Sequence, residues 1–153
     1  MVKRALLKEA IILRGLPGSG KSHWAQHYLA QLPSELAEQI KQYGYCSTDN
    51  YFMANGQYRF DKRRLSEYHQ RNLAAFIQAM ADGLPRVICD NTNLALWEFI
   101  AYETAAKAMG YQVRIVLIGE PQNREHQVLC AKRNRHGVSL TQISAMARQF
   151  EPG

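Results

Sequence analysis

A glycine-rich stretch after the first apolar run has the residue types and the spacing of a phosphate-binding loop. Gly15, Gly20, Lys21 and Ser22 match the pattern G-x-x-x-x-G-K-[ST], and a helical pattern follows over about 21–32. Glycines allow a tight turn in which successive backbone N–H groups point at an anion, and the positive end of the helix dipole adds to the attraction. Lys21 can reach the outer phosphates of a nucleotide, and the Ser22 hydroxyl can ligate Mg²⁺. The sequence therefore predicts a triphosphate site formed by Gly15, Leu16, Pro17, Gly18, Ser19, Gly20, Lys21, Ser22 and His23.

Two aspartates that end further apolar runs could act on such a triphosphate. Asp90 ends the run RVICD, where a carboxylate can hold Mg²⁺ beside Ser22 through water. The alternative for Asp90 is an N-cap of the next helix, a role that Thr92 or Asn93 could also fill. Asp49 ends YCSTD and can orient an acceptor hydroxyl and take its proton, the alternative being a turn aspartate. We favour the metal role for Asp90 and the general-base role for Asp49.

A basic segment late in the chain, CAKRNRHG at 130–137, has the composition of a flap that could close on phosphates. It contains Lys132, Arg133, Arg135 and His136, followed by a glycine and a new helix start. Arginines that close on a transferring phosphate neutralise developing charge and exclude water. The alternative is a solvated helix end whose cations complement the helix dipole.

The connection between the first acid and the next helix, at 50–61, is rich in aromatic residues. Tyr51, Phe52 or Tyr58 could stack on a base of an acceptor, although packing of the loop onto the domain is the more ordinary role. Arg59, Arg63 and Arg64 could meet acceptor phosphates or keep a helix face soluble. His69 and Asn72 share a helix face, and we expect a structural polar pair there.

Short apolar runs alternate with helical patterns along the chain, which predicts an α/β fold with a parallel sheet between two layers of helices. Ligands gather at the carboxyl ends of the strands in such a sheet, which is where the loop and both aspartates lie. The predicted strands are 10–14, 45–48, 87–89 and 113–118. The predicted helices are about 21–32, 61–83, 92–110 and 125–135, and a last one that starts at a capping box between Ser139 and Gln142.

Length and composition fit one domain over 1–153. The chain is 46% hydrophobic and 21% charged, as in ordinary water-soluble globular proteins, and no apolar run approaches the ~20 residues of a membrane span. Cys46, Cys89 and Cys130 are far apart and in no CxxC pair, so we expect buried free thiols and a cytoplasmic protein. The net charge of +6 adds some weight to a polyanionic partner.

The motifs RGLPGSGKS, STDNYF, YRFD, CDNTN and KRNRHGV occur in an order that resembles a family of small P-loop kinases. This family includes the 5′-kinase domain of phage polynucleotide kinase and, more distantly, zeta toxins and related AAA-type ATP-binding domains. The resemblance implies a P-loop NTPase three-layer sandwich with four or five parallel strands. In it, the Asp90 strand lies beside the loop strand, and a helical lid covers about 125–142.

The same resemblance implies residue roles and a reaction. Lys21 and Ser22 match the phosphate and metal residues, Asp49 the general base, and Asp90 the acid of the third strand. Arg133 and Arg135 match the lid arginines. The phage enzyme carries a second acid and then an arginine after its first acid, whereas Asn50, Tyr51 and Phe52 follow Asp49, with Arg59 as a possible substitute.

We therefore expect an ATP- and Mg²⁺-dependent kinase that phosphorylates a hydroxyl, with the 5′-hydroxyl end of a nucleic acid as the favoured acceptor. A kinase of a nucleoside, sugar or antibiotic and a nucleotide-dependent adaptor or switch are the alternatives. No membrane association is expected.

Overall fold

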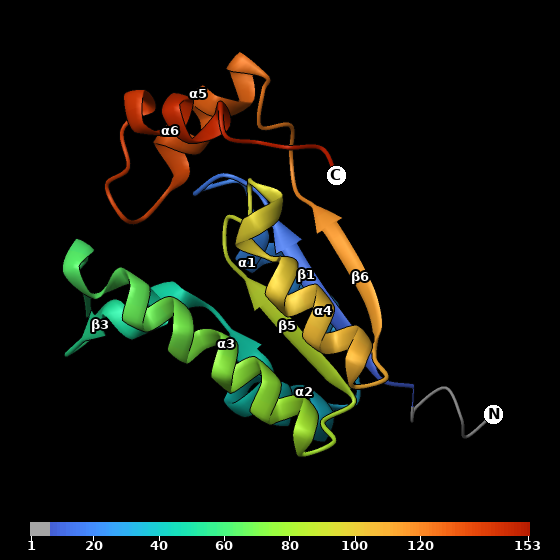
Figure 1. The fold of residues 1–153 in the computed structure, drawn as a ribbon. Coiled ribbons are helices and arrows are strands. Elements are labelled where there is room, and N and C mark those ends of the chain that lie inside the picture. Colours follow the sequence, from blue (N-terminus) through green and yellow to red (C-terminus); the bar gives the residue numbers. More distant parts are fainter. Residues whose placement is uncertain (1–6) are drawn as a thin grey trace.

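The sheet has the predicted parallel arrangement. The computed structural model describes residues 7–153, and its four-stranded sheet has the order β2-β5-β1-β6 (Figure 1). All three strand pairs are parallel, and the strand that ends at Asp90 lies directly beside the strand that leads into the glycine-rich loop. The strands are β1 (Glu9–Arg14), β2 (Tyr45–Cys46), β5 (Arg86–Asp90) and β6 (Gln112–Leu117).

Helices cover the two faces of the sheet in the expected α/β layering. Side chains of β1 alternate: Ala10 and Ile12 pack against one helical layer, and Ile11 and Leu13 pack against the other. α3 (Leu65–Ala81) and α4 (Ile100–Ala108) form the first layer, in front of the sheet in Figure 1. The second layer consists of α1 (Lys21–Ala30), α2 (Ser34–Gln39) and the π-helix η2 (Ile40–Gly44).

The edge strand β6 is less covered than its apolar sequence predicts. Ile115 and Leu117 are 42% and 43% exposed, while the central strands β1 and β5 are almost fully buried. The reason is position: β6 has a neighbouring strand on one side alone among the described residues.

The helix expected from about 92 begins later than predicted. Asn93 is buried in a left-handed conformation (φ 47°), and its side chain donates to the Leu13 carbonyl at 2.8 Å. This tie to β1 prevents a helical start, so the chain forms a short 3₁₀ turn, η5 (Leu96–Glu98), before α4. The alternative N-cap role of Asp90 is therefore wrong, because α4 starts ten residues after Asp90, with Phe99 at its N-cap.

Other boundaries follow local signals. Asp61 caps a 3₁₀ turn, η4 (Lys62–Arg64), which continues into α3, and Gly83 with φ 83° ends that helix. Within the aromatic connection, a small hairpin of β3 (Met53–Ala54) and β4 (Gln57–Tyr58) turns at Asn55 and Gly56, both with positive φ. It follows the 3₁₀ helix η3 (Thr48–Phe52).

α5 (Arg124–Arg133) and α6 (Leu140–Ala147) stand above the carboxyl ends of the strands (Figure 1). The predicted capping box between Ser139 and Gln142 starts α6. A separate small core holds this helix pair to the loop, formed by Leu16, Leu94, Cys130, Ile143 and Ala147.

The three cysteines are buried and free, as expected. Among residues 7–153, no helix combines the length and the apolar character that crossing a membrane requires.

Candidate active site

The glycine-rich loop has a backbone that side chains would disrupt. Gly18 and Gly20 adopt positive φ angles of 83° and 108°, which glycine tolerates without strain. A Cβ at Gly18 would lie 2.4 Å from the Cys130 carbonyl oxygen, and one at Gly15 would lie 2.5 Å from Ser19 Oγ. The glycines therefore let the loop turn tightly between β1 and α1 while α5 packs against it.

The interior of the loop offers donors that suit an anion. Among the described residues, the buried Ser19 hydroxyl has no hydrogen-bond partner. Lys21 Nζ donates to the carbonyls of Gly15 and Leu16, at 3.0 Å each. Gly20 is the N-cap of α1, whose first-turn N–H groups have no intrahelical acceptor. These groups fit a phosphate, which would satisfy the Ser19 hydroxyl and draw Lys21 away from the loop carbonyls.

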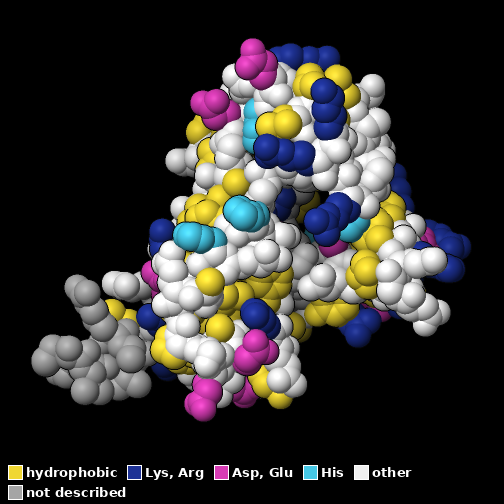
Figure 2. All heavy atoms as spheres, turned by 180° about the vertical axis from the view of Figure 1, so that it is seen from behind, with side chains coloured by type: hydrophobic (Ala, Val, Ile, Leu, Met, Phe, Trp, Pro, Cys, Tyr) yellow, Lys and Arg dark blue, Asp and Glu magenta, His cyan; other side chains and the backbone are white. Residues whose placement is uncertain are grey.

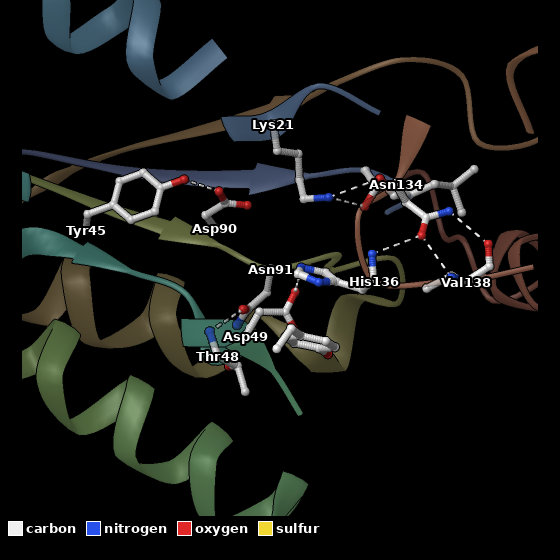
Figure 3. A network of polar contacts seen from close by, with 12 residues as sticks. Lys21, Tyr45, Thr48, Asp49, Asp90, Asn91, Asn134, His136 and Val138 are labelled. Carbon is white, nitrogen blue, oxygen red and sulfur yellow. Dashed lines mark hydrogen bonds and ion pairs between the residues drawn. The ribbon is translucent and has the colours of Figure 1, made fainter. Parts of the chain in front are cut away.

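Asp90 is a buried carboxylate beside this loop. It is 7% exposed, and burial raises its pKa, while the Lys21 ammonium and hydrogen bonds from Tyr45 and Ser22 favour its ionised form. The Tyr45 hydroxyl on β2 donates to Asp90 Oδ2 (Figure 3). The hydroxyl of Ser22 and the carboxylate of Asp90 are oxygen donors of the kind that Mg²⁺ prefers, so the residues present fit the cation.

Asp49 lies on η3, at the end of the neighbouring strand β2, with its side chain 55% exposed. The start of η3 is fixed to β5, because the Thr48 N–H donates to Asn91 Oδ1 at 2.9 Å. The Tyr58 hydroxyl donates to Asp49 Oδ1 at 3.3 Å, and His136 Nε2 lies 3.8 Å from Asp49 Oδ2 (Figure 3). The Tyr58 and His136 rings stack at 3.7 Å.

The two aspartates and Lys21 influence one another electrostatically. Burial lowers the pKa of Lys21, and the carboxylates of Asp90 and Asp49 oppose this shift, in that order. Asp49 in turn contributes to the raised pKa of Asp90. Three residues separated by up to 69 positions in the chain thus gather at the carboxyl end of one sheet, the arrangement expected of parallel α/β sites.

Arg133 is the last residue of α5, and Arg135 lies in the connection from α5 to α6. Both are exposed, and neither guanidinium forms a hydrogen bond or ion pair with the part of the chain at 7–153. His136, in the same connection, contacts the segment that carries Asp49. Its ring stacks on Tyr58, and its Nε2 lies near the Asp49 carboxylate. Figure 2 shows Lys and Arg side chains around a hollow below the upper part of the molecule that α5 and α6 form. A flap function of these arginines stays a prediction.

Three side-chain contacts of this site were not predicted from the sequence, although His136 belongs to the basic segment singled out there. Tyr45, Asn91 and His136 make the contacts that fix Asp90, η3 and the α5–α6 turn. Asn91 follows Asp90 directly, which is a local signal, whereas the contacts of Tyr45 and His136 depend on tertiary structure. His69 and Asn72 make structural contacts, as expected, but with separate partners instead of with each other: His69 meets Thr48 Oγ1 at 2.9 Å, and Asn72 donates to the Tyr102 hydroxyl at 2.9 Å.

A family described as an AAA domain, AAA_33, matches residues 11–153, which include the loop and both aspartates. The chain belongs to this family of P-loop kinase-like domains. Human NEDD4-binding protein 2 is 36% identical to this AAA_33 domain over 143 residues, which cover 92% of the chain and 8% of that protein. Rat YLP motif-containing protein 1 is 28% identical over 160 residues, which cover 92% of the chain and 11% of that protein. The chain thus spans about a tenth of the length of these relatives.

Solved structures share the fold. A chain of the Pnkp1/Rnl/Hen1 complex matches 80% of the AAA_33 domain, with a TM-score of 0.59 and 18% identity, and 38% of that chain is covered. A gluconokinase from Sinorhizobium meliloti 1021 matches 95% of the AAA_33 domain, with a TM-score of 0.55 and 16% identity. The match covers 76% of the gluconokinase chain. Kinases of this fold generally use a nucleotide with a divalent metal.

Proposed function

We propose that the chain is an ATP- and Mg²⁺-dependent phosphotransferase whose acceptor is the 5′-hydroxyl of a nucleic acid. The observation that carries the proposal is the meeting of Lys21, Asp90 and Asp49 at one end of the sheet, beside a loop built for phosphates. The arrangement supplies a cation for the triphosphate, a buried acid beside Ser22 and an exposed acid for an acceptor. Phosphoryl transfer to an alcohol needs each of these groups.

The loop would bind the β- and γ-phosphates of ATP through backbone N–H groups and the Ser19 hydroxyl. Lys21 would leave the carbonyls of Gly15 and Leu16 and pair with the outer phosphates, which compensate its burial better than two neutral acceptors. Ser22 and Asp90 would hold Mg²⁺, which when bound neutralises charge on the β- and γ-phosphates.

Asp49 would act on the acceptor. Its carboxylate accepts the proton of the hydroxyl while that oxygen forms a bond to the γ-phosphorus. The bond between the γ-phosphorus and the β–γ bridging oxygen breaks, and ADP leaves with the electron pair. Tyr58, which donates to Asp49, orients the carboxylate. Arg133 and Arg135 belong to the same segment as His136, which lies against Asp49, and would neutralise charge on the transferring group when this segment closes on it.

Two features support a nucleic acid as the acceptor. The net charge of +6 favours a polyanion, and Asp49 is exposed at the surface, where the end of a strand can reach it. A structural neighbour belongs to a complex that contains Pnkp1, which adds weight on the level of the fold.

Transfer of labelled γ-phosphate from ATP to DNA and RNA oligonucleotides with 5′-hydroxyl ends tests the proposal. Asp49→Asn should lower the transfer rate by about 10²–10⁴-fold and keep ATP affinity, because the amide cannot accept the proton. Asp82→Asn, at an exposed carboxylate beyond the end of α3, is the matched control and should leave both unchanged.

Three results would contradict parts of the proposal. Transfer to nucleosides or sugars and to no oligonucleotide would exclude the nucleic-acid acceptor and indicate a small-molecule kinase. ATP binding without transfer to any of these acceptors would indicate a nucleotide-dependent binding module. An Asp49→Asn variant with full transfer activity would exclude Asp49 as the general base.

A further inference from the structure

A groove lies on the surface next to Asp49 and is unused by the chemistry described above. It is a cavity of about 510 Å³ between η3, the β3–β4 hairpin and the first turns of α3. These elements lie together at one edge of the molecule, around the label β3 in Figure 1. The aromatic and cationic side chains that line it include Tyr51, Arg59, Phe60, Arg63, Arg64 and Tyr68.

Aromatic rings form the apolar part of the groove. The Tyr51 and Tyr68 rings stack at 5.6 Å with an angle of 29° between their planes. Phe52 is buried beneath them, and the ring of Phe60 contacts it at 5.0 Å while remaining 54% exposed. An exposed phenylalanine beside half-buried tyrosines presents π-faces to the solvent, a feature that stacking on bases requires.

Cations surround these rings. The guanidinium of Arg64 lies 5.0 Å from the centroid of the Tyr68 ring, and that of Arg71 lies 5.0 Å from Tyr51 and 5.8 Å from Tyr68. Residues 59–71 carry five arginines or lysines and two carboxylates, a net charge of +3 out of +6 for the chain. Thirteen residues thus hold half of the net positive charge, next to exposed rings.

The groove shares the helix η3 with the proposed acceptor site. Asp49 and Tyr51 belong to the same short helix η3, and Tyr58, which donates to Asp49, packs its ring edge against Phe52 at 6.1 Å. Phe52 also contacts Tyr68 at 4.7 Å, on the floor of the groove. Because Asp49 and Tyr51 are two positions apart on η3, the groove is close enough to receive the units that follow an acceptor hydroxyl held at Asp49.

We infer that this groove is a second subsite that binds the nucleotides following the 5′ end of a single-stranded polynucleotide. The inference rests on the proposed function for its acceptor. Bases stack on the rings of Tyr51, Phe60 and Tyr68, and phosphates pair with Arg59, Arg63 and Arg64. In the last two cases a phosphate replaces a carboxylate, because Arg63 is paired with Asp61 at 3.1 Å and Arg64 with Glu67 at 3.0 Å. A single strand fits because its bases are free to stack on protein rings, whereas bases in a duplex already stack on one another.

The test combines acceptor length with arginine variants. The probes are 5′-hydroxyl oligonucleotides of two and eight nucleotides with a fluorescein at the 3′ end, used for steady-state kinetics and, without ATP, for fluorescence anisotropy. In the unaltered protein, KM should be about tenfold lower for the octamer than for the dinucleotide, because one or two stacked bases and phosphate pairs are added. The kcat should be the same for both.

Arg59→Gln and Arg64→Gln should each raise the KM and Kd of the octamer about fivefold, and should raise the KM of the dinucleotide by less, because only one nucleotide of the dinucleotide follows the 5′ end. Each should also flatten the plot of log Kd against log salt concentration by about 0.7, the value for one lost phosphate contact on a single strand. Arg114→Gln is the matched control, because Arg114 is an exposed arginine over an aromatic ring, Trp24, at the opposite edge of the sheet. It should change none of these values.

The outcomes separate the inference from the proposed function. Phosphorylation of both oligonucleotides with equal KM, or arginine variants that behave like Arg114→Gln, would overturn the subsite and keep the kinase. Salt-dependent octamer binding that the arginine variants weaken, without any phosphorylation, would support the groove and contradict the proposed acceptor. Absence of both binding and phosphorylation would overturn both.

Discussion

Asp90 shows how a site residue opposes the stability of the folded chain. Its carboxylate is 7% exposed, and burial is the largest cause of its raised pKa. Lys21, its cationic neighbour, has a pKa that burial lowers, so each group is held in a position that disfavours its own charge. A bound triphosphate would give the Lys21 ammonium a partner of opposite charge, and a bound Mg²⁺ would do the same for the Asp90 carboxylate. Both charged forms would then be stabilised.

Asp90→Asn should stabilise the nucleotide-free protein at neutral pH by about 1 kcal/mol. Since the pKa is raised in the folded state, the folded chain binds the proton more tightly than the unfolded chain. The free energy of unfolding of the unaltered protein therefore falls as pH rises from the unfolded value of 3.8 through the folded pKa. Urea denaturation should show a higher free energy of unfolding for Asp90→Asn than for the unaltered protein at pH 7, and a smaller difference between the two at pH 4.

Asp82→Asn is the control, because Asp82 is exposed and accepts a hydrogen bond from Gln78 alone among the described side chains. It should show no gain that depends on pH. A variant Asp90→Asn that is less stable than the unaltered protein at pH 7 would mean that attraction to Lys21 outweighs burial.

At the scale of elements, the connection between α5 and α6 is organised by one amide side chain. Asn134 Nδ2 donates to the carbonyls of Cys130, Ala131 and Val138, at 3.1, 3.1 and 2.8 Å. Its Oδ1 accepts from the backbone N–H groups of His136 and Val138 (Figure 3). The position of His136 against Tyr58 thus depends on the amide, which joins the end of one helix to the approach of the next.

Asn134→Asp should loosen this turn. The substitution keeps the acceptors and replaces the donor by an oxygen that faces three carbonyl oxygens, so we expect a loss of about 2 kcal/mol in stability. Hydrogen exchange of backbone amides at 134–139 should become faster, with little change in β1 and β5. Asn123→Asp is the control, since Asn123 caps α5 by accepting from His126 and aspartate caps equally well. Unchanged exchange at 134–139 would contradict the role of Asn134.

Elements encoded by contiguous residues could be predicted from the sequence, and those fixed by distant contacts could not. The loop at Gly15–Ser22, the acid-bearing strand ends and the cap at Ser139 each depend on a few neighbouring residues. The start of α4 could not be predicted, because it depends on a bond between Asn93 and a strand 80 positions earlier. The exposure of β6 depends on its place at the edge of the sheet.

The candidate site divides in the same way. Motif spacing indicates the loop, Asp49 and Asp90, because the polar ends of parallel strands meet at one edge. The contacts of Tyr45 with Asp90 and of His136 with Asp49 join segments 45 and 87 positions apart. Side-chain contacts over such separations are set by how the layers pack, and no local pattern encodes them.

At the scale of the whole molecule, one buried arginine joins β1 to the end of the chain. Arg14, 3% exposed, donates to the carbonyls of Asn93 at 2.7 Å, Leu94 at 2.7 Å and Glu151 at 2.6 Å. Its guanidinium lies between the rings of Phe99 and Phe150, 4.7 and 4.9 Å from their centroids. Because Gly15 follows directly, this cluster also fixes the start of the phosphate-binding loop.

Arg14→Lys should lower the free energy of unfolding by about 3 kcal/mol, because an ammonium cannot reach all three carbonyls and leaves buried acceptors unpaired. Urea denaturation measures the loss, and ATP affinity should fall with it, since the loop begins at the next residue. Arg114→Lys on the exposed edge strand β6 is the matched control and should stay within about 0.5 kcal/mol of the unaltered protein. Equal stability of the two variants would mean that packing of Phe99 and Phe150, and not the fork of hydrogen bonds, holds the end of the chain to the sheet.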